Sequence, residues 1–121
     1  MATNKIKARA LDLEREFKVA TPEDFLRTVL ADVGLGYEVD LEQYHQENID
    51  KVLPGDIVYK YRGTMRDAIY GICLDEKQVI IGWARKVTKF IYPQRVMLSS
   101  LQGWQKLYRI PAGDIKGAKA K

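Results

Sequence analysis

The stretch that decides the fold runs from residue 54 to residue 85 and reads PGDIVYKYRGTMRDAIYGICLDEKQVIIGWAR. β-Branched and aromatic residues fill it and glycines interrupt it at short intervals, a composition typical of strands joined by tight turns. In the first predicted strand, Ile57 and Tyr59 point to one face, whereas Val58 and Lys60 point to the other. This pattern predicts a small antiparallel β unit.

Five strands are predicted, at residues 57–61, 68–74, 78–85, 87–92 and 104–110. Between the second and the third, Asp75-Glu76-Lys77 is short enough for a hairpin turn, so these two strands are expected to be antiparallel neighbours. Residues 93–103 fit either a helical turn or a further strand. The expected sheet is small and five-stranded, and it curls towards a barrel.

Two helices are expected before the strands. From Ile6 to Phe17, apolar residues recur at spacings of four, three and four, which aligns them on one helical face. The second helix has clear boundaries, because Thr21 can cap it, Pro22 fits its first position and Gly34 is typical of the residue after a helix end. Both helices are expected to pack on the sheet.

A third stretch, from Asp40 to Val52, also has helical spacing. Asp40 and Gln43 resemble a capping box at its start, although a loop with a single helical turn would give the same pattern. Residues 37–39 are expected to form a short strand before it.

The 121 residues are expected to make one domain. Its fold class is α+β, with two or three N-terminal helices packed on a small five-stranded antiparallel sheet or barrel. Residues 1–53 are its mainly helical part, residues 54–112 its β-rich part, and residues 113–121 a flexible basic tail.

The formal net charge of +4 hides a steep asymmetry along the chain. Residues 1–36 carry six bases and six acids, and residues 37–56 carry one base and six acids, a net charge of −5. Residues 57–121 carry thirteen bases and four acids, a net charge of +9. A basic half favours a polyanionic or acidic partner, unless the acidic stretch shields it within the chain.

Aromatic and basic residues alternate in the second half. Nucleic-acid binding uses this mixture, because bases stack on aromatic rings while Lys and Arg neutralise phosphates. The alternative is a structural role, with aromatics in a small core and bases on its solvated face. The candidate nucleic-acid contacts are Lys60, Tyr61, Arg62, Arg66, Trp83, Arg85, Lys86 and Lys89.

Turn glycines and strand apolar residues carry a resemblance to a known fold. Gly55-Asp56-Ile57-Val58, Gly63, Gly71-Ile72 and Val79-Ile80-Ile81 resemble the opening hairpins of SH3-like barrels. Their spacing is similar to that of KOW-type modules of ribosomal and transcription proteins. The resemblance covers residues 54–85 and implies an SH3-like barrel.

A second resemblance, to papain-like peptidases, rests on Pro54-Gly55-Asp56 and Tyr70-Gly71-Ile72. Those enzymes need a cysteine at a helix start and a histidine on a nearby strand. Here Cys73 falls in a predicted strand and His45, the sole histidine, in a predicted helix. The catalytic chemistry is therefore not expected to carry over.

Asp56, Asp75 and Lys77 fit the loose Asp…Asp-x-Lys pattern of metal-dependent nucleases. Both carboxylates stand where turns are predicted, and aspartate is common in turns. A structural role is favoured for both, and no metal site is predicted.

Several classes of function lack their sequence signals. No phosphate-binding loop and no dinucleotide-binding glycine pattern is present, so no cofactor is expected. The single cysteine cannot form an internal disulfide, and no window approaches the ~18 apolar residues of a membrane span. A cytoplasmic protein without a membrane partner is expected.

We therefore expect a binding module without enzymatic activity, with nucleic acid as the favoured ligand. The alternative is a protein-interaction module of a phage, plasmid or host-interaction kind, which uses the acidic helical part and can form a homodimer. A metal-dependent nuclease ranks third.

Overall fold

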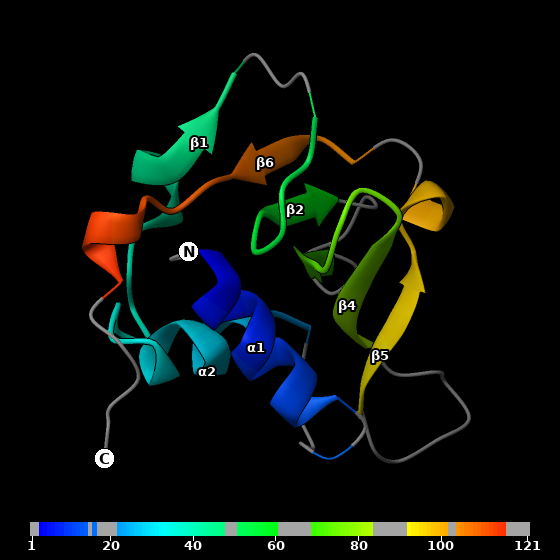
Figure 1. The fold of residues 1–121 in the computed structure, drawn as a ribbon, viewed down its shortest axis with the longest axis horizontal. Helices are drawn as coiled ribbons and strands as arrows, with labels where there is room; N and C mark the ends of the chain where they lie inside the picture. Colours follow the sequence, from blue (N-terminus) through cyan, green and yellow to red (C-terminus); the bar gives the residue numbers. More distant parts are fainter. Residues whose placement is uncertain are drawn as a thin grey trace.

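Two helices cover one face of an antiparallel sheet of six strands (Figure 1). The structure, a computed structural model, describes residues 3–14, 16, 22–47, 51–60, 69–83, 92–101 and 104–115. The fold class is α+β, as the sequence predicts.

Helix α1 spans Thr3–Leu13 and helix α2 spans Pro22–Asp32. α2 begins at its proline and is followed by Gly34, whose φ of 95° lies in the left-handed region that glycine favours. The Leu35 N–H donates to the Leu30 carbonyl at an N···O distance of 3.0 Å, which is the long bond of a Schellman motif. The predicted start at Pro22 and the glycine after the helix end are confirmed, whereas the predicted cap, Thr21, lies outside the described residues.

The third predicted helix is wrong. Asp40 caps only a short 3-10 helix, η1 (Leu41–Tyr44), through a bond from the Glu42 N–H to its side chain. The chain then forms strand β1 (His45–Gln46), which pairs with a strand near the C-terminus. This tertiary pairing overrides the local helical spacing.

The short strand predicted at residues 37–39 is also absent from the described chain, which forms a turn there. Arg27 of α2 donates to the backbone carbonyls of Tyr37 and Val39. The backbone groups that a strand would use are therefore bonded to a helix side chain.

The sheet runs in the order β1-β6-β2-β3-β4-β5, with all neighbours antiparallel. Its remaining strands are β2 (Ile57–Lys60), β3 (Ile69–Cys73), β4 (Gln78–Trp83), β5 (Tyr92–Met97) and β6 (Lys106–Tyr108). A hairpin turn at residues 74–77 joins β3 to β4, as predicted.

The sheet differs from the prediction in strand number and closure. Over the described residues it has six strands instead of five, and it is open, because β1 and β5 lie at opposite edges. The fourth predicted strand, 87–92, overlaps the structure only at Tyr92, since residues 87–91 lie outside the described residues. β5 instead occupies the ambiguous stretch, which ends in the 3-10 helix η3 (Leu98–Leu101).

Both faces of the sheet are apolar. On one face the helices and strands form a cluster that we call the helix-side core: Ile6, Ala10, Phe25, Leu26, Val29, Leu30, Val33, Leu41, Tyr44, Ile57, Ile72, Leu74, Ile80, Tyr108, Ile110 and Ile115. On the other face lies a smaller cluster, the second core: Val58, Ile69, Cys73, Val79, Ile81 and Leu107. The central strands therefore carry apolar residues at nearly every position, because neither face is left to solvent.

The chain after β6 returns to the helix-side core. A 3-10 helix, η4 (Ala112–Asp114), is followed by Ile115, which is buried in that core. Residues 113–115, which the sequence places in a basic tail, thus contribute a core side chain, and residues 116–121 lie outside the described residues. Within the described chain, neither helix has the length and apolar character needed to span a membrane.

Candidate nucleic-acid interface

The two ends of the sheet differ in chemistry because of strand direction. β2 and β4 are both antiparallel to β3, so they run the same way and finish at the same end of the sheet. β3, β5 and β6 begin at that end. Its aromatic and basic positions are Tyr59, Lys60, Tyr70, Trp83, Tyr92, Trp104 and Lys106, and we call it the aromatic end.

The strand register aligns several of these residues. Tyr59 of β2 lies opposite Tyr70 of β3 on one side and Lys106 of β6 on the other. The rings of Tyr59 and Tyr70 are 5.0 Å apart between centroids and tilted by 49°. Trp83 of β4 lies opposite Tyr92 of β5, so four strands present an aromatic position close to this end.

Of the predicted nucleic-acid contacts, only Lys60 is described with its side chain, which is half-buried at the end of β2. Trp83 is the last residue of β4, but its side chain lies outside the described part. The other six contacts, Tyr61, Arg62, Arg66, Arg85, Lys86 and Lys89, also lie outside it.

Those six residues belong to residues 61–68 and 84–91, which we call the two basic segments. The first segment follows β2 and the second follows β4. Because both strands finish at the aromatic end, both basic segments start and return there. The order of the strands thus attaches both basic segments to the same end of the sheet, although they are separate in the sequence.

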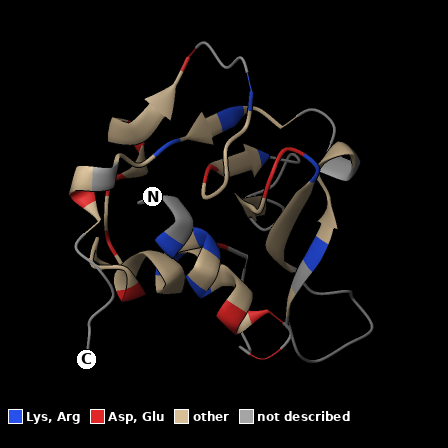
Figure 2. Cartoon of the chain, viewed as in Figure 1, with Lys and Arg blue, Asp and Glu red and all other residues tan. Residues whose placement is uncertain are grey.

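The positive charge of the chain is unevenly distributed between its parts. The described residues hold ten Lys/Arg and fourteen Asp/Glu, a net charge of −4 (Figure 2). The remaining residues hold ten Lys/Arg and two Asp/Glu, a net charge of +8. The two basic segments account for +4 of this excess and residues 116–121 for +3.

Half of the described bases bind carboxylates within the fold. These five are Arg9, Arg27, Arg95, Lys106 and Arg109. Arg27 binds Glu23 within α2, whereas the other four join segments far apart in sequence, such as the 2.8 Å contact from Arg95 Nη2 of β5 to Glu14 Oε1 after α1. The described part of the fold is therefore unlike a uniformly basic surface.

Glu42, in η1, contacts both ends of β6 on the helix side of the sheet. Glu42 Oε2 accepts hydrogen bonds from the Tyr108 hydroxyl at 2.8 Å and from Lys106 Nζ at 3.1 Å, and these bonds lower the pKa of Glu42. Burial, followed by the negative charge of Glu23, raises the pKa of Tyr70 to about 12. Arg27, which binds Glu23, acts in the opposite direction and lowers the pKa of Tyr70.

Sequence reasoning missed Tyr59 and Tyr70 as site candidates. A signal for them was present, because they flank the basic segment 61–68 closely on both sides. A hairpin between their two strands aligns such residues across the ladder. The long-range neighbour Lys106 had no signal, since β6 reaches β2 only through the folded topology.

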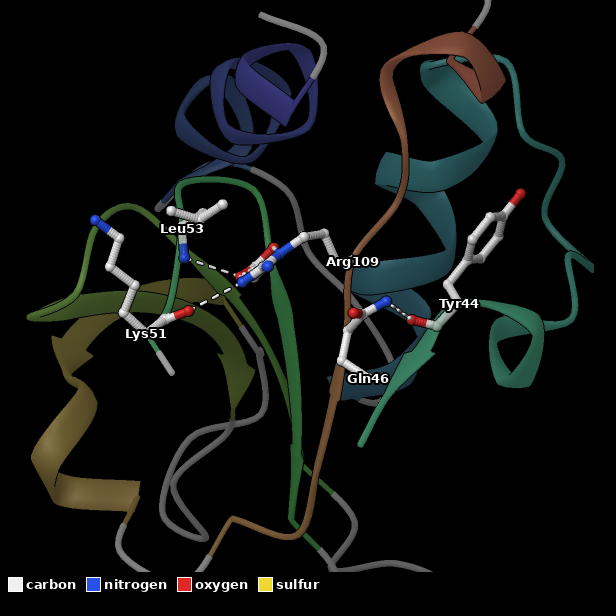
Figure 3. A network of polar contacts seen from close by, with 6 residues as sticks. Tyr44, Gln46, Lys51, Leu53 and Arg109 are labelled. Atoms are coloured by element: carbon white, nitrogen blue, oxygen red, sulfur yellow. Dashed lines mark hydrogen bonds and ion pairs between the residues drawn. The ribbon is translucent and has the colours of Figure 1, made fainter. Parts of the chain in front are cut away.

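The opposite end of the sheet holds a buried ion pair (Figure 3). Asp56 is 0% exposed, and both of its carboxylate oxygens accept bonds from Arg109, at 3.0 Å from Nε and 2.8 Å from Nη2. The Leu53 N–H donates to the same carboxylate at 2.8 Å, and Arg109 Nη2 also donates to the Lys51 carbonyl. Asp56 and Arg109 therefore hold the turn before β2 against the end of β6.

Both carboxylates of the hypothetical nuclease site make structural contacts of this kind. Asp56 is enclosed by Arg109, and Asp75 Oδ1 accepts bonds from the backbone N–H groups of Lys77 and Gln78 at 2.7 and 2.9 Å. Both aspartates thus shape turns, as predicted. No group of three or more His, Cys, Asp or Glu side chains in the described ranges is arranged to hold a metal ion.

Cys73 and His45 are not brought together. Cys73 is fully buried in β3, and burial raises the pKa of its thiol to about 12, which disfavours a nucleophilic thiolate. His45 lies in β1 at the sheet edge, with its ring 5.9 Å from that of Tyr108, so its prediction as a helix residue is wrong. β6 and β2 separate the two strands, and no papain-like pair forms.

Asp75 gives the hairpin a testable dependence on pH. Its backbone hydrogen bonds lower its pKa, so its stabilising contribution is present above the ordinary value of about 3.9 and is lost as the pH falls through the lower folded value. We expect Asp75→Ala to melt at a lower temperature than the parent at about pH 7, and the difference to shrink at about pH 3. Circular dichroism melts measure both values. Glu76→Ala on the same hairpin is the control, and a pH-independent difference for Asp75→Ala would contradict the argument.

Comparison of the chain with protein-family models, with curated proteins and with solved structures finds no match.

Proposed function

We propose that this protein is a binding module without enzymatic activity that holds nucleic acid at the aromatic end of its sheet. The observation that carries the proposal is the common direction of β2 and β4. It attaches both basic segments to the sheet end where Tyr59, Lys60 and Tyr70 stand. The segments that carry most of the candidate phosphate-binding residues are therefore attached to the sheet end where base-stacking residue types stand.

The chemistry of the proposed contact has two parts. Six bases, those of the two basic segments and Lys60, neutralise phosphates and release counterions. If all six contact a single strand, log K falls with log salt at a slope of roughly −4, from about 0.7 per phosphate. The aromatic positions add stacking, which is tolerant of base sequence.

The charge of the described residues supports this location over a diffuse basic surface. These residues are acidic overall, and half of their bases already bind carboxylates. A polyanion is therefore attracted to the segments outside them. Apart from the basic segments, the largest such group is the C-terminal stretch 116–121. It follows β6, which finishes at the opposite end, and it serves as an internal comparison.

The test compares two variants that each remove three positive charges. In the segment variant, Arg85, Lys86 and Lys89 become glutamine. In the tail variant, Lys116, Lys119 and Lys121 become glutamine. Binding of fluorescein-labelled DNA and RNA strands of about 16 nucleotides is followed by anisotropy at roughly 50 to 200 mM salt.

We expect the parent protein to bind with a clear salt slope. The segment variant should bind at least about tenfold more weakly, with a slope smaller by about 2, and the tail variant should stay within about threefold of the parent. A parent protein that fails to bind at low salt would overturn the proposed function. Equal losses in the two variants would overturn its placement at the aromatic end.

A further inference from the structure

We infer that two copies of this protein associate through the outward face of α1, with the two helices antiparallel and packed around Ala8. The inference goes beyond the proposed function, because it uses none of the residues assigned to nucleic acid. Three features carry it: the exposed residues of α1, the order of the charges along this helix, and the exposed apolar side chain on the neighbouring sheet edge.

The face of α1 that points away from the core carries four exposed residues: Lys5, Ala8, Leu11 and Asp12. Ile6 and Ala10 are 0% exposed, and at about 100° per residue Ala8 lies opposite the direction midway between them. Leu11, one turn further, is 36% exposed. Since Ala8 has a small side chain, another helix can approach this face closely.

The charges of α1 are ordered against its dipole. Acids in the first turn and bases in the last turn stabilise a helix, and α1 has neither. Lys5 instead lies in the first turn and Asp12 in the last, so the helix is basic near its start and acidic at its end (Figure 2). A neighbour with the opposite order of charges would therefore stabilise it.

The charges at the two ends of this face are available to such a neighbour. Among the described residues, Lys5 has no ion-pair partner. The Asp12 side chain is 67% exposed, and its contact with Arg9 is long, at 3.6 Å. Arg9 makes its shorter bond, at 2.7 Å, to Asp32 of α2.

An antiparallel second copy is the partner that fits this order of charges. Around a two-fold axis at Ala8, Lys5 of each copy lies opposite Leu11 and Asp12 of the other. Its aliphatic stem can cover Leu11 while its ammonium group binds Asp12. A parallel pair would instead place like charges side by side. The face is thus complementary to itself, as a closed two-fold dimer requires.

The apolar part of this surface extends to the edge of the sheet. Glu14, three residues after Leu11, binds Arg95 of β5 at 2.8 Å. Met97 follows two residues later on the same side of that strand and is 52% exposed. A helix face and a strand edge make a smaller contact than the standard interface of about 800 Å² per partner, so the dimer is expected to be weak.

Sedimentation equilibrium between roughly 10 µM and 1 mM measures this association. We expect a monomer–dimer equilibrium with a dissociation constant on the order of 100 µM. Ala8→Glu keeps a good helix former but places two like charges at the axis, so it should weaken the dimer at least about tenfold. A parent protein that remains monomeric at about 1 mM would overturn the inference.

Two charge reversals test the antiparallel arrangement. Lys5→Glu and Asp12→Lys each turn both ion pairs between the copies into like-charge contacts, and each should weaken the dimer about tenfold. Both substitutions suit the helix dipole, so circular dichroism melts should show no loss of folding that could explain the weaker association. Glu38→Lys, which reverses an exposed acid outside α1, is the control and should associate like the parent.

An equal mixture of the two reversed variants gives the sharpest result. The two acids of Lys5→Glu then face the two bases of Asp12→Lys, so the mixture should associate within about threefold of the parent affinity although each variant alone does not. A mixture no better than its components, or parent-like association of either variant alone, would overturn the arrangement. The segment and tail variants test nucleic-acid binding separately, so failure of one proposal leaves the other standing.

Discussion

Replacing Arg109 by alanine is expected to lower the free energy of unfolding by about 3–5 kcal/mol, the largest effect of any single change considered for this protein. Asp56 is 0% exposed, and the substitution leaves its charge in the interior with only the Leu53 N–H as a described partner. The carbonyl of Lys51 loses its donor as well. The cost comes from the unpaired buried charge rather than from the attraction alone.

Urea denaturation of three variants separates these contributions. The double variant Asp56→Ala/Arg109→Ala should lose less stability than the sum of its single variants, because it leaves no unpaired charge. Arg95→Ala is the matched control, since Arg95 also makes two bonds to one carboxylate, that of Glu14, but this carboxylate is 15% exposed, whereas Asp56 is 0% exposed. We expect a loss of about 1 kcal/mol or less there. An equally small loss in Arg109→Ala would show that the buried pair contributes nothing special.

Replacing Gly71 by alanine is expected to cost about 1–3 kcal/mol of unfolding free energy. Gly71 lies in the centre of β3 on the side of the second core. A Cβ there would lie 2.5 Å from Cγ2 of Val79 and 3.0 Å from Cγ2 of Ile81. Side chains of β4 therefore fill the space next to Gly71, and an added methyl group would overpack the second core.

Chemical denaturation tests this overpacking with an internal rescue. Val79→Ala removes the closest clashing atom, so the double variant Gly71→Ala/Val79→Ala should lose less stability than the two single losses together. Gly113→Ala is the control, because its Cβ would meet nothing within 4 Å. Strictly additive losses at Gly71 and Val79 would show that the two side chains do not compete for the same space.

The sequence predicted those parts of the fold that depend on the backbone chemistry of single residues. Pro22, which lacks a backbone N–H, begins α2, and Gly34, which tolerates a positive φ, follows its end. The hairpin at residues 74–77 was predicted for the same reason. By contrast, β1 forms only by pairing with β6, some sixty residues further along the chain. No local sequence pattern predicts it.

The candidate site also has one part that follows from the sequence and another that only the folded chain reveals. Residue types led to nucleic acid as the proposed ligand and marked the two basic segments, since charge and aromatic content are properties of the sequence. The common end of the sheet depends on the order β6-β2-β3-β4-β5, which is a property of the folded chain. The Asp56–Arg109 pair was unpredictable for that reason too, because 53 positions separate its members.

The position of the Asp56–Arg109 pair has an evolutionary consequence. The ion pair lies at the end of the sheet where a short turn joins β3 to β4. The two longer connections between neighbouring strands, residues 61–68 and 84–91, leave from the other end. Under the proposed function, substitutions in those connections would change ligand recognition while leaving the ion pair intact. A library restricted to residues 61–68 and 84–91 is where new ligand preferences would be selected.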